Sequence, residues 1–132
     1  MNKSSVKILL IEDDHWLAES YQQILLASGF ECQVVSEAEL AMRVIDESPP
    51  DVIVADVLLG DHTVVPLLHE LQTYEDTRKT PVILCTAINT AGSDLTKQLH
   101  SYGVVAVLDK STLTPELLLN TVREYTHAVD SN

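Results

Sequence analysis

Two kinds of apolar pattern alternate along this chain. Continuous apolar runs of strand length cover residues 6–11, 31–36, 51–56, 82–86 and 104–108. Between and after them, apolar residues recur every three or four positions, as on one face of a helix. Strands that are apolar without alternation are typical of a parallel sheet buried on both faces. The pattern therefore predicts strand and helix repeated five times.

The predicted helices are bounded by residues that end or begin a helix. The first starts at His15 and stops at Gly29, and the second covers 37–48 and ends at a Pro-Pro pair. The third lies around 64–71, the fourth around 94–102, and the last starts at Pro115 after a Thr114 cap. Apolar residues at helical spacing are Trp16, Leu17, Tyr21, Ile24 and Leu25 in the first helix, Ala38, Leu40, Ala41, Val44 and Ile45 in the second, and Leu117, Leu118, Val122 and Tyr125 in the last.

Five strand–helix units in 132 residues fit one domain, 1–132, without a repeat or an interdomain linker. Parallel strands need crossover connections, and these are right-handed in nearly all proteins. We therefore expect an α/β fold, a doubly wound open sheet with helices on both faces.

Charge and composition exclude several classes of function. The chain carries 20 acidic residues against 8 Lys and Arg, a net charge of −12. Such a balance repels phosphate backbones and anionic lipid, so we expect no direct binding of nucleic acid and no membrane partner. The apolar runs are shorter than the ~20 residues of a membrane span. Residues 1–5 lead directly into a strand without a signal peptide, and Cys32 and Cys85 are expected to be buried thiols, so we expect a cytoplasmic protein.

The candidate chemistry lies where the predicted strands end. In an open parallel sheet, ligands bind outside the carboxyl ends of the strands, and those ends meet at one edge. The polar residues at these ends are Glu12, Asp13 and Asp14 after the first strand, Asp56 after the third, Thr86 after the fourth and Lys110 after the fifth. Asp14 has an alternative role: it could cap the helix at His15 and take no part in the chemistry.

Phosphoryl transfer onto a carboxylate needs this set of residue types. Clustered acids can hold Mg²⁺, which prefers oxygen ligands. Asp56 would attack phosphorus, as aspartates do when they form acyl phosphates. Lys110 and the Thr86 hydroxyl can hold the remaining phosphoryl oxygens.

The sequence resembles the receiver domain of bacterial two-component response regulators over about residues 6–128. The segments that carry the resemblance are 7–14 (KILLIEDD), 51–56 (DVIVAD), 80–87 (TPVILCTA) and 103–110 (GVVAVLDK). The resemblance implies a CheY-like, flavodoxin-like (βα)5 domain with a parallel sheet of order 2-1-3-4-5.

The resemblance also implies roles for individual residues. Asp56 would accept a phosphoryl group from a histidine kinase or histidine phosphotransfer protein. Asp13 and Asp56 would ligate Mg²⁺ with the backbone carbonyl of Leu58, and Glu12 would act through water. Thr86 would be the switch hydroxyl and Lys110 the salt-bridging lysine. The chain would then be a signalling switch for a partner protein or output domain, which promotes its own phosphorylation and slow dephosphorylation, and not a metabolic enzyme.

Four positions depart from the family pattern. Val107 stands where the family usually has Tyr or Phe, so the usual relay from the switch hydroxyl is not available. Ser111 replaces a Pro that follows a cis bond, which leaves two alternatives for Lys110–Ser111: a trans bond with a rearranged loop, or a retained cis bond at ~3 kcal/mol. The loop 59–63 is unusual, and the segment between Thr86 and Gly103 is about two residues longer.

Two apolar residues predict a long-lived phosphorylated state. Leu58 and Ile88 lie two positions beyond Asp56 and Thr86, and neither can position a hydrolytic water by hydrogen bonding. An apolar rim that excludes water predicts slow loss of the phosphoryl group.

Two other functions stay open at this point. One is a receiver-like interaction module that signals independently of phosphorylation, which the altered switch positions favour. The other is an aspartyl-phosphate hydrolase, which usually has a second Asp where this chain has Leu58. The kinase, the output, the oligomeric state and the length of the natural protein are not encoded in these patterns.

Overall fold

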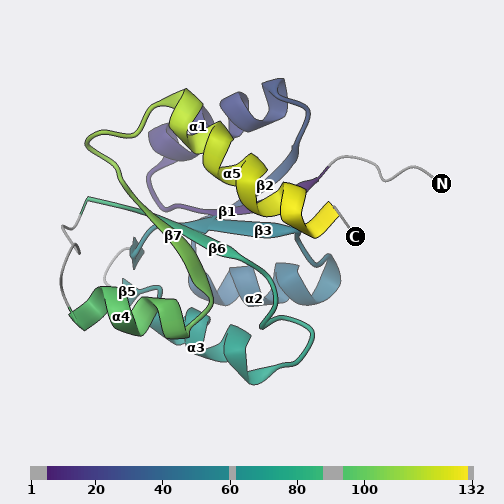
Figure 1. Cartoon of the computed structure of the whole chain (residues 1–132), viewed down its shortest axis with the longest axis vertical. Coiled ribbons are helices and arrows are strands. Elements are labelled where there is room, and N and C mark those ends of the chain that lie inside the picture. Colours follow the sequence, from purple (N-terminus) through teal and green to yellow (C-terminus); the bar gives the residue numbers. More distant parts are fainter. Residues whose placement is uncertain (1–5, 60–61, 88–93, 131–132) are drawn as a thin grey trace.

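The computed structural model of the chain describes residues 6–59, 62–87 and 94–130 (Figure 1). The elements in order are β1 (Lys7–Ile11), α1 (His15–Ala27), β2 (Glu31–Val35), α2 (Ala38–Glu47), β3 (Val52–Ala55), β4 (Leu58–Leu59), β5 (His62–Thr63), α3 (Val65–Thr73), β6 (Val82–Thr86), α4 (Asp94–Ser101), β7 (Val104–Asp109) and α5 (Pro115–Asp130).

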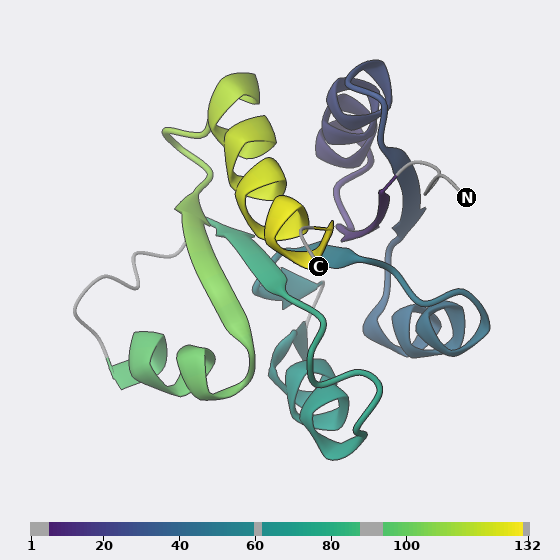
Figure 2. The same ribbon diagram turned by 45° about the vertical axis from the view of Figure 1, so that its right-hand side comes forward.

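Five of these strands form one parallel sheet of order β2-β1-β3-β6-β7. With β6 and β7 as the fourth and fifth sheet strands, this is the predicted order 2-1-3-4-5, so the doubly wound fold is confirmed. Helices α1 and α5 cover one face, and α2, α3 and α4 cover the other (Figures 1 and 2).

The core consists of two apolar layers, one on each face of the sheet. Leu9 and Ile11 of β1 pack toward α2 and α3, whereas Ile8 and Leu10 pack toward α1 and α5. All four residues of β3 are buried. Each fully buried Leu or Ile stabilises the fold by about 1.5–3 kcal/mol relative to an exposed one. The continuous apolar runs of β1, β3 and β6 are thus explained by burial on both faces.

Three apolar residues that share the predicted helix faces point outward instead. Trp16 is 82 % exposed, Leu40 39 % and Leu117 40 %. In α1, the buried positions include Tyr21 and Leu25, which are spaced by four residues. Because each residue turns the helix by about 100°, a side chain five positions before Tyr21 lies well off that face. Helix geometry itself therefore places Trp16 off the buried face, and its inclusion among the inner residues was wrong.

The predicted ends of the first and fourth helices and the predicted start of the last are confirmed, whereas α3 continues to Thr73, beyond the predicted 64–71. Gly29 follows α1 with φ +93° and Gly103 follows α4 with φ +86°, a region that glycine adopts at little cost. The Thr114 Oγ1 atom accepts a hydrogen bond from the Leu117 N–H at 3.1 Å, so Thr114 caps α5 as predicted.

A short antiparallel hairpin, β4–β5, was not predicted. Leu58 pairs with Thr63 and Leu59 with His62, and the Val64 N–H donates to the Val57 carbonyl at 2.8 Å. Strands of two residues are too short to give a periodic pattern. The hairpin lies directly after Asp56 and fixes part of the loop 59–63, although residues 60–61 are outside the described residues.

The two thiols are enclosed to different degrees. Cys85 is buried, and burial raises its pKa to about 12. Cys32 is only half-buried, and desolvation raises its pKa to about 11. Both thiols are therefore protonated at neutral pH.

Within the described ranges, no helix combines the length and the apolar character that crossing a bilayer requires.

Candidate functional site

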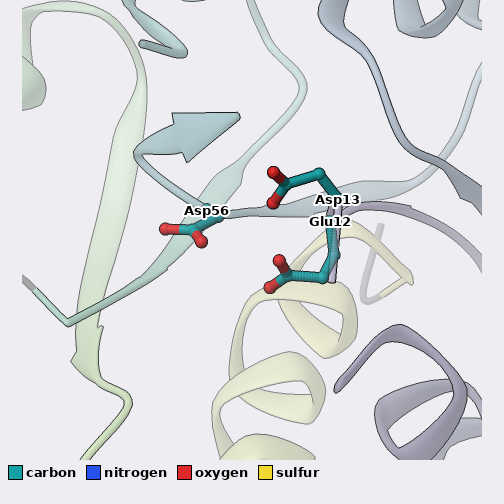
Figure 3. Close-up of side chains that lie close together, drawn as sticks. All are labelled: Glu12, Asp13 and Asp56. Carbon is teal, nitrogen blue, oxygen red and sulfur yellow. The ribbon is translucent and has the colours of Figure 1, made fainter. Parts of the chain in front are cut away.

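The register of β1 against β3 brings the first acids and Asp56 together. Ile11 pairs with Ala55, and the Asp56 N–H donates to the Ile11 carbonyl at 3.1 Å. The residues that follow these strands therefore leave the sheet side by side. Carboxylate oxygens of Glu12, Asp13 and Asp56 all lie within 4.8 Å of one another (Figure 3). The sequence-predicted acids form one cluster.

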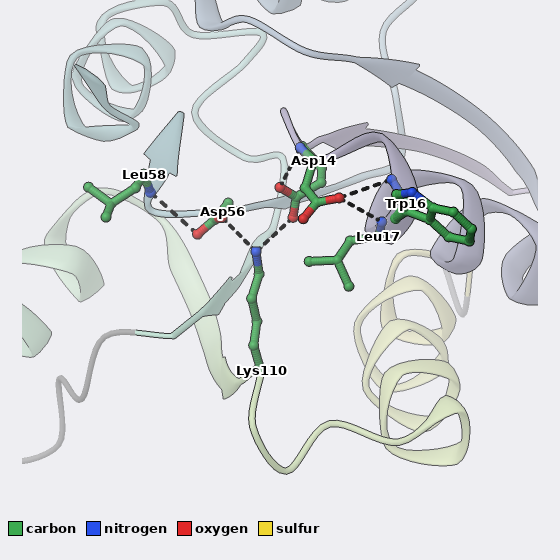
Figure 4. A network of polar contacts seen from close by, with 7 residues as sticks. Asp14, Trp16, Leu17, Asp56, Leu58 and Lys110 are labelled. Carbon is green, nitrogen blue, oxygen red and sulfur yellow. Dashed lines mark hydrogen bonds and ion pairs between the residues drawn. The ribbon is translucent and has the colours of Figure 1, made fainter. Parts of the chain in front are cut away.

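Lys110, the residue after β7, forms ion pairs with two of these acids. Its Nζ lies 2.9 Å from Glu12 Oε1 and 2.6 Å from Asp56 Oδ2 (Figure 4). The three side chains are largely enclosed, with exposed fractions of 15 % for Lys110, 2 % for Glu12 and 12 % for Asp56. The ammonium group therefore offsets the repulsion between two carboxylates in a partly desolvated site.

Burial and ion pairing act in opposite directions on these groups. Burial raises the pKa of Glu12, and its hydrogen bond with Lys110 opposes this without cancelling it. For Lys110, burial by itself lowers the pKa, but the hydrogen bonds to Asp56 and Glu12 outweigh it, so the pKa is raised overall. The lysine is thus held as a cation at neutral pH.

Asp14 serves as the helix cap that the sequence left open. Its Oδ1 atom accepts hydrogen bonds from the N–H groups of Trp16 at 2.9 Å and Leu17 at 3.2 Å. The Asp14 N–H in turn donates to Glu12 Oε2 at 3.1 Å. The start of α1 and the buried Glu12 are therefore connected (Figure 4).

Thr86 and Leu58 lie at the same edge of the sheet. Thr86 is 1 % exposed, and its carbonyl accepts the N–H of Lys110 at 2.9 Å. The Leu58 N–H donates to Asp56 Oδ1 at 3.3 Å, while its side chain is 45 % exposed. Ile88, the second predicted rim residue, lies outside the described residues.

The loop after Lys110 answers one question that the sequence left open. Every peptide bond between described residues is trans, so Lys110–Ser111 is trans. Asp109 Oδ1 accepts hydrogen bonds from the Ser111 N–H at 2.9 Å and from Ser111 Oγ at 2.8 Å, and these bonds lower the pKa of Asp109. Asp side chains often accept a hydrogen bond from the backbone two residues further on, a local turn signal that the sequence prediction did not include.

Val107 lies in the sheet opposite Leu84 of β6. It is half-buried and packs against the apolar layer on the α2 and α3 side. Leu84 and Thr86 are two positions apart in β6, so their side chains lie on the same face of the sheet. Val107 lies beside Leu84 in the register and therefore shares this face with Thr86, the predicted switch residue.

The family model described as "Response regulator receiver domain" matches residues 8–123. The chain belongs to the response regulator receiver domain family. This membership confirms the resemblance in the sequence and accounts for the strand order. Receiver domains are signalling modules of two-component systems, and this chain is one of them.

Two curated relatives and one solved structure illustrate the similarity. A protein-glutamate methylesterase/protein-glutamine glutaminase of Chromobacterium violaceum is 31 % identical over 108 residues, 80 % of this receiver and 30 % of the relative. The transcriptional regulatory protein CpxR of Klebsiella pneumoniae is 34 % identical over 93 residues, 70 % of this receiver and 37 % of CpxR. The receiver therefore spans about a third of the length of these relatives.

The solved structure is the receiver domain of a sensor histidine kinase from Pseudomonas aeruginosa, described with a magnesium ion coordinated in its active site cleft. It superposes with a TM-score of 0.81 at 22 % identity, covering 94 % of this receiver and 99 % of that chain. At this identity the likeness establishes the fold.

Proposed function

We propose that this receiver is a phosphorylation switch in which Asp56 accepts a phosphoryl group from a histidine kinase or a histidine phosphotransfer protein. The observation that carries the proposal is the three-carboxylate cluster with Lys110 2.6 Å from Asp56. A nucleophilic carboxylate must be ionised, and a neighbouring cation favours the ionised form.

The transfer follows from these positions. A carboxylate oxygen of Asp56 attacks the phosphorus of a phosphohistidine, and the new O–P bond forms as the P–N bond to the imidazole breaks. The imidazole nitrogen keeps the electron pair and takes up a proton. Lys110 Nζ remains beside Asp56 and stabilises the negative charge that arrives with the phosphoryl oxygens.

The acid cluster fits a divalent cation. Its ligand atoms are all carboxylate oxygens, which suit Mg²⁺. Asp13 and Asp56 would hold the ion with the Leu58 carbonyl, and Glu12 would act through water. When bound, Mg²⁺ would neutralise part of the phosphoryl charge. The magnesium described in the Pseudomonas aeruginosa receiver supports this proposal.

The experiment is labelling with acetyl phosphate in the presence of Mg²⁺, followed by intact-mass measurement. We expect one added phosphoryl group on the wild-type chain and none on Asp56→Asn or after chelation of the metal. Asp46→Asn, an exposed acid on α2, is the matched control and should label normally. Labelling of Asp56→Asn at the wild-type level would contradict the proposal.

A second candidate is a receiver-like module that signals without phosphate. Val107 favours it, because a valine has neither the reach nor the ring of the usual aromatic residue. Beryllofluoride with Mg²⁺ distinguishes the two candidates, because an adduct at Asp56 that changes partner binding supports the switch. Partner binding that is the same with and without beryllofluoride supports the module.

The signal would pass to a protein partner or output domain. The relatives are named as a methylesterase and a transcriptional regulator, and each is much longer than this receiver. With a net charge of −12, we propose that the receiver itself does not bind nucleic acid.

A further inference from the structure

A cleft of about 410 Å³ opens between the start of α2, the hairpin β4–β5 and the start of α3. Its apolar lining comes from Ala38, Leu59 and Pro66, and the acids Glu37 and Glu39 line it from the α2 side. Sites for small molecules typically measure roughly 300–1,000 Å³ and combine an apolar lining with a few polar groups. The cleft therefore has the size and the composition of a small-molecule site.

The cleft carries negative charge that no described basic side chain neutralises. Neither Glu37 nor Glu39 forms an ion pair with a described residue, and the Glu37 side chain makes no hydrogen bond that caps α2. The helix dipole favours acids at the start of α2, but it does not require an apolar cleft beside them. A ligand that complements this lining combines a positive charge with an apolar body.

The spacing of the polar groups favours an organic cation over a metal ion. His62 also lines the cleft, and imidazole and carboxylate are common metal ligands. Among the described residues, however, only the acid cluster at Asp56 brings three such ligand atoms within 4.8 Å of one another. Glu37, Glu39 and His62 are thus too far apart to coordinate one ion together. An ammonium or guanidinium group on an apolar body can reach a carboxylate while the body packs on the apolar lining.

One wall of the cleft is the hairpin that begins two residues after Asp56. Leu59 and His62 face the cleft and pair with each other across the hairpin. The neighbouring Leu58 N–H donates to Asp56 Oδ1 at 3.3 Å (Figure 4). A ligand packed against Leu59 therefore restrains the segment that contacts Asp56 and that carries the Leu58 carbonyl, a proposed ligand of Mg²⁺.

We infer that this cleft binds a small organic cation, an amine or guanidine with an apolar body, and that the bound cation speeds phosphorylation by holding the hairpin beside Asp56. The effect on phosphorylation rests on the proposed function of Asp56, whereas binding of the cation does not. The two parts are therefore tested separately.

The binding test uses tryptamine as the cationic probe, with neutral tryptophol and anionic indole-3-propionate as analogues of the same shape. Each is titrated into the isotope-labelled chain and followed by NMR. We expect tryptamine to shift the amide signals of Ala38 and Leu59 with a Kd on the order of 1 mM. Tryptophol should bind about fivefold more weakly, and indole-3-propionate should not bind at these sites. Saturating tryptamine should raise the rate of acetyl phosphate labelling about twofold or more.

The double variant Glu37→Gln, Glu39→Gln removes both charges from exposed positions, and thermal unfolding verifies that it folds. It should bind tryptamine about fivefold more weakly and tryptophol as before. Glu47→Gln changes an exposed acid at the other end of α2 and is the matched control, which should bind both probes like the wild type.

Equal affinity of tryptamine for the wild type and the double variant would overturn the binding site, and so would equal affinities for tryptamine and tryptophol. Tryptamine that binds the cleft without changing the labelling rate would overturn the link to Asp56. Absence of labelling both with and without tryptamine would instead contradict the proposed function, and the NMR titration would still decide whether the cleft binds the cation.

Discussion

At the scale of single residues, the site depends on how firmly Lys110 is held. Its Nζ contacts Glu12 and Asp56, and its backbone N–H donates to the carbonyl of Thr86. The next residue is fixed by Asp109, whose carboxylate accepts two hydrogen bonds from Ser111. This turn restrains the chain immediately after Lys110.

Asp109→Ala removes the oxygen that accepts both hydrogen bonds from Ser111, without altering any group that touches Asp56. We expect acetyl phosphate labelling to slow on the order of tenfold, because a small displacement of the Lys110 ammonium weakens charge stabilisation during transfer. Asp109→Asn keeps an oxygen acceptor and should retain most of the rate. The measurement is the initial labelling rate at saturating Mg²⁺, and equal rates for Asp109→Ala and the wild type would refute the role of the turn.

We predict that Leu58 prolongs the lifetime of the phosphoryl group on Asp56. Its backbone N–H donates to Asp56 Oδ1, and its side chain has no group that could orient water, so phosphorylated wild type should decay slowly. Leu58→Asn introduces a polar side chain at the same position and should shorten the half-life several-fold. Loss of label from purified phosphorylated protein measures this. A wild-type half-life as short as that of fast chemotaxis receivers would show that the apolar rim does not protect the phosphoryl group.

At the scale of elements, the turn from α4 into β7 is fastened to α3. Gln72 Nε2 donates to the Tyr102 carbonyl at 3.0 Å and contacts the Arg78 carbonyl at 3.5 Å. The turn itself needs Gly103 at φ +86°. A Cβ on Gly103 would lie 2.6 Å from Gln72 Nε2, so the glycine also makes room for the hydrogen bond.

Gly103→Ala should destabilise the domain by about 2–3 kcal/mol, since it combines backbone strain with the displacement of Gln72. Gly29→Ala is the matched control, with φ +93° and open space around the added Cβ, and should lose about 1 kcal/mol. Urea denaturation of both variants measures the difference. Equal losses would mean that the contact with Gln72 contributes nothing.

At the scale of the whole molecule, repulsion within the acid cluster lowers the stability of the folded domain. Like charges are concentrated at one edge of a domain whose net charge is already −12, and one lysine neutralises only part of them. A cation that binds only the folded state would therefore add stability.

Mg²⁺ at ten times its dissociation constant should raise the free energy of unfolding by about 1.4 kcal/mol. Asp13→Asn removes one ligand and one charge, so it should greatly reduce this gain. Asp46→Asn should keep the gain, because this exposed acid lies on α2 outside the cluster. Thermal or urea unfolding with Mg²⁺ and with chelator measures both effects, and an equal gain in Asp13→Asn would exclude this residue as a ligand.

The sequence by itself determined the order of strands and helices, because continuous apolar runs and glycine or proline breaks are local signals. It also placed Asp56 and Lys110 at strand ends, and a parallel sheet necessarily brings such ends to one edge. The family membership and the sheet order are confirmed. The roles of the site residues remain proposals that the labelling experiments test.

Only the tertiary structure decided which side chains are covered. The sequence prediction grouped Trp16 with Tyr21, although a separation of five residues already places the two about 140° apart around a helix. The trans bond at Lys110–Ser111 and the hairpin β4–β5 also depend on contacts between residues that periodicity does not relate. Apolar periodicity indicates that a helix has a buried face, whereas packing against other elements determines which residues at its margin are covered, as the exposed Leu40 and Leu117 show.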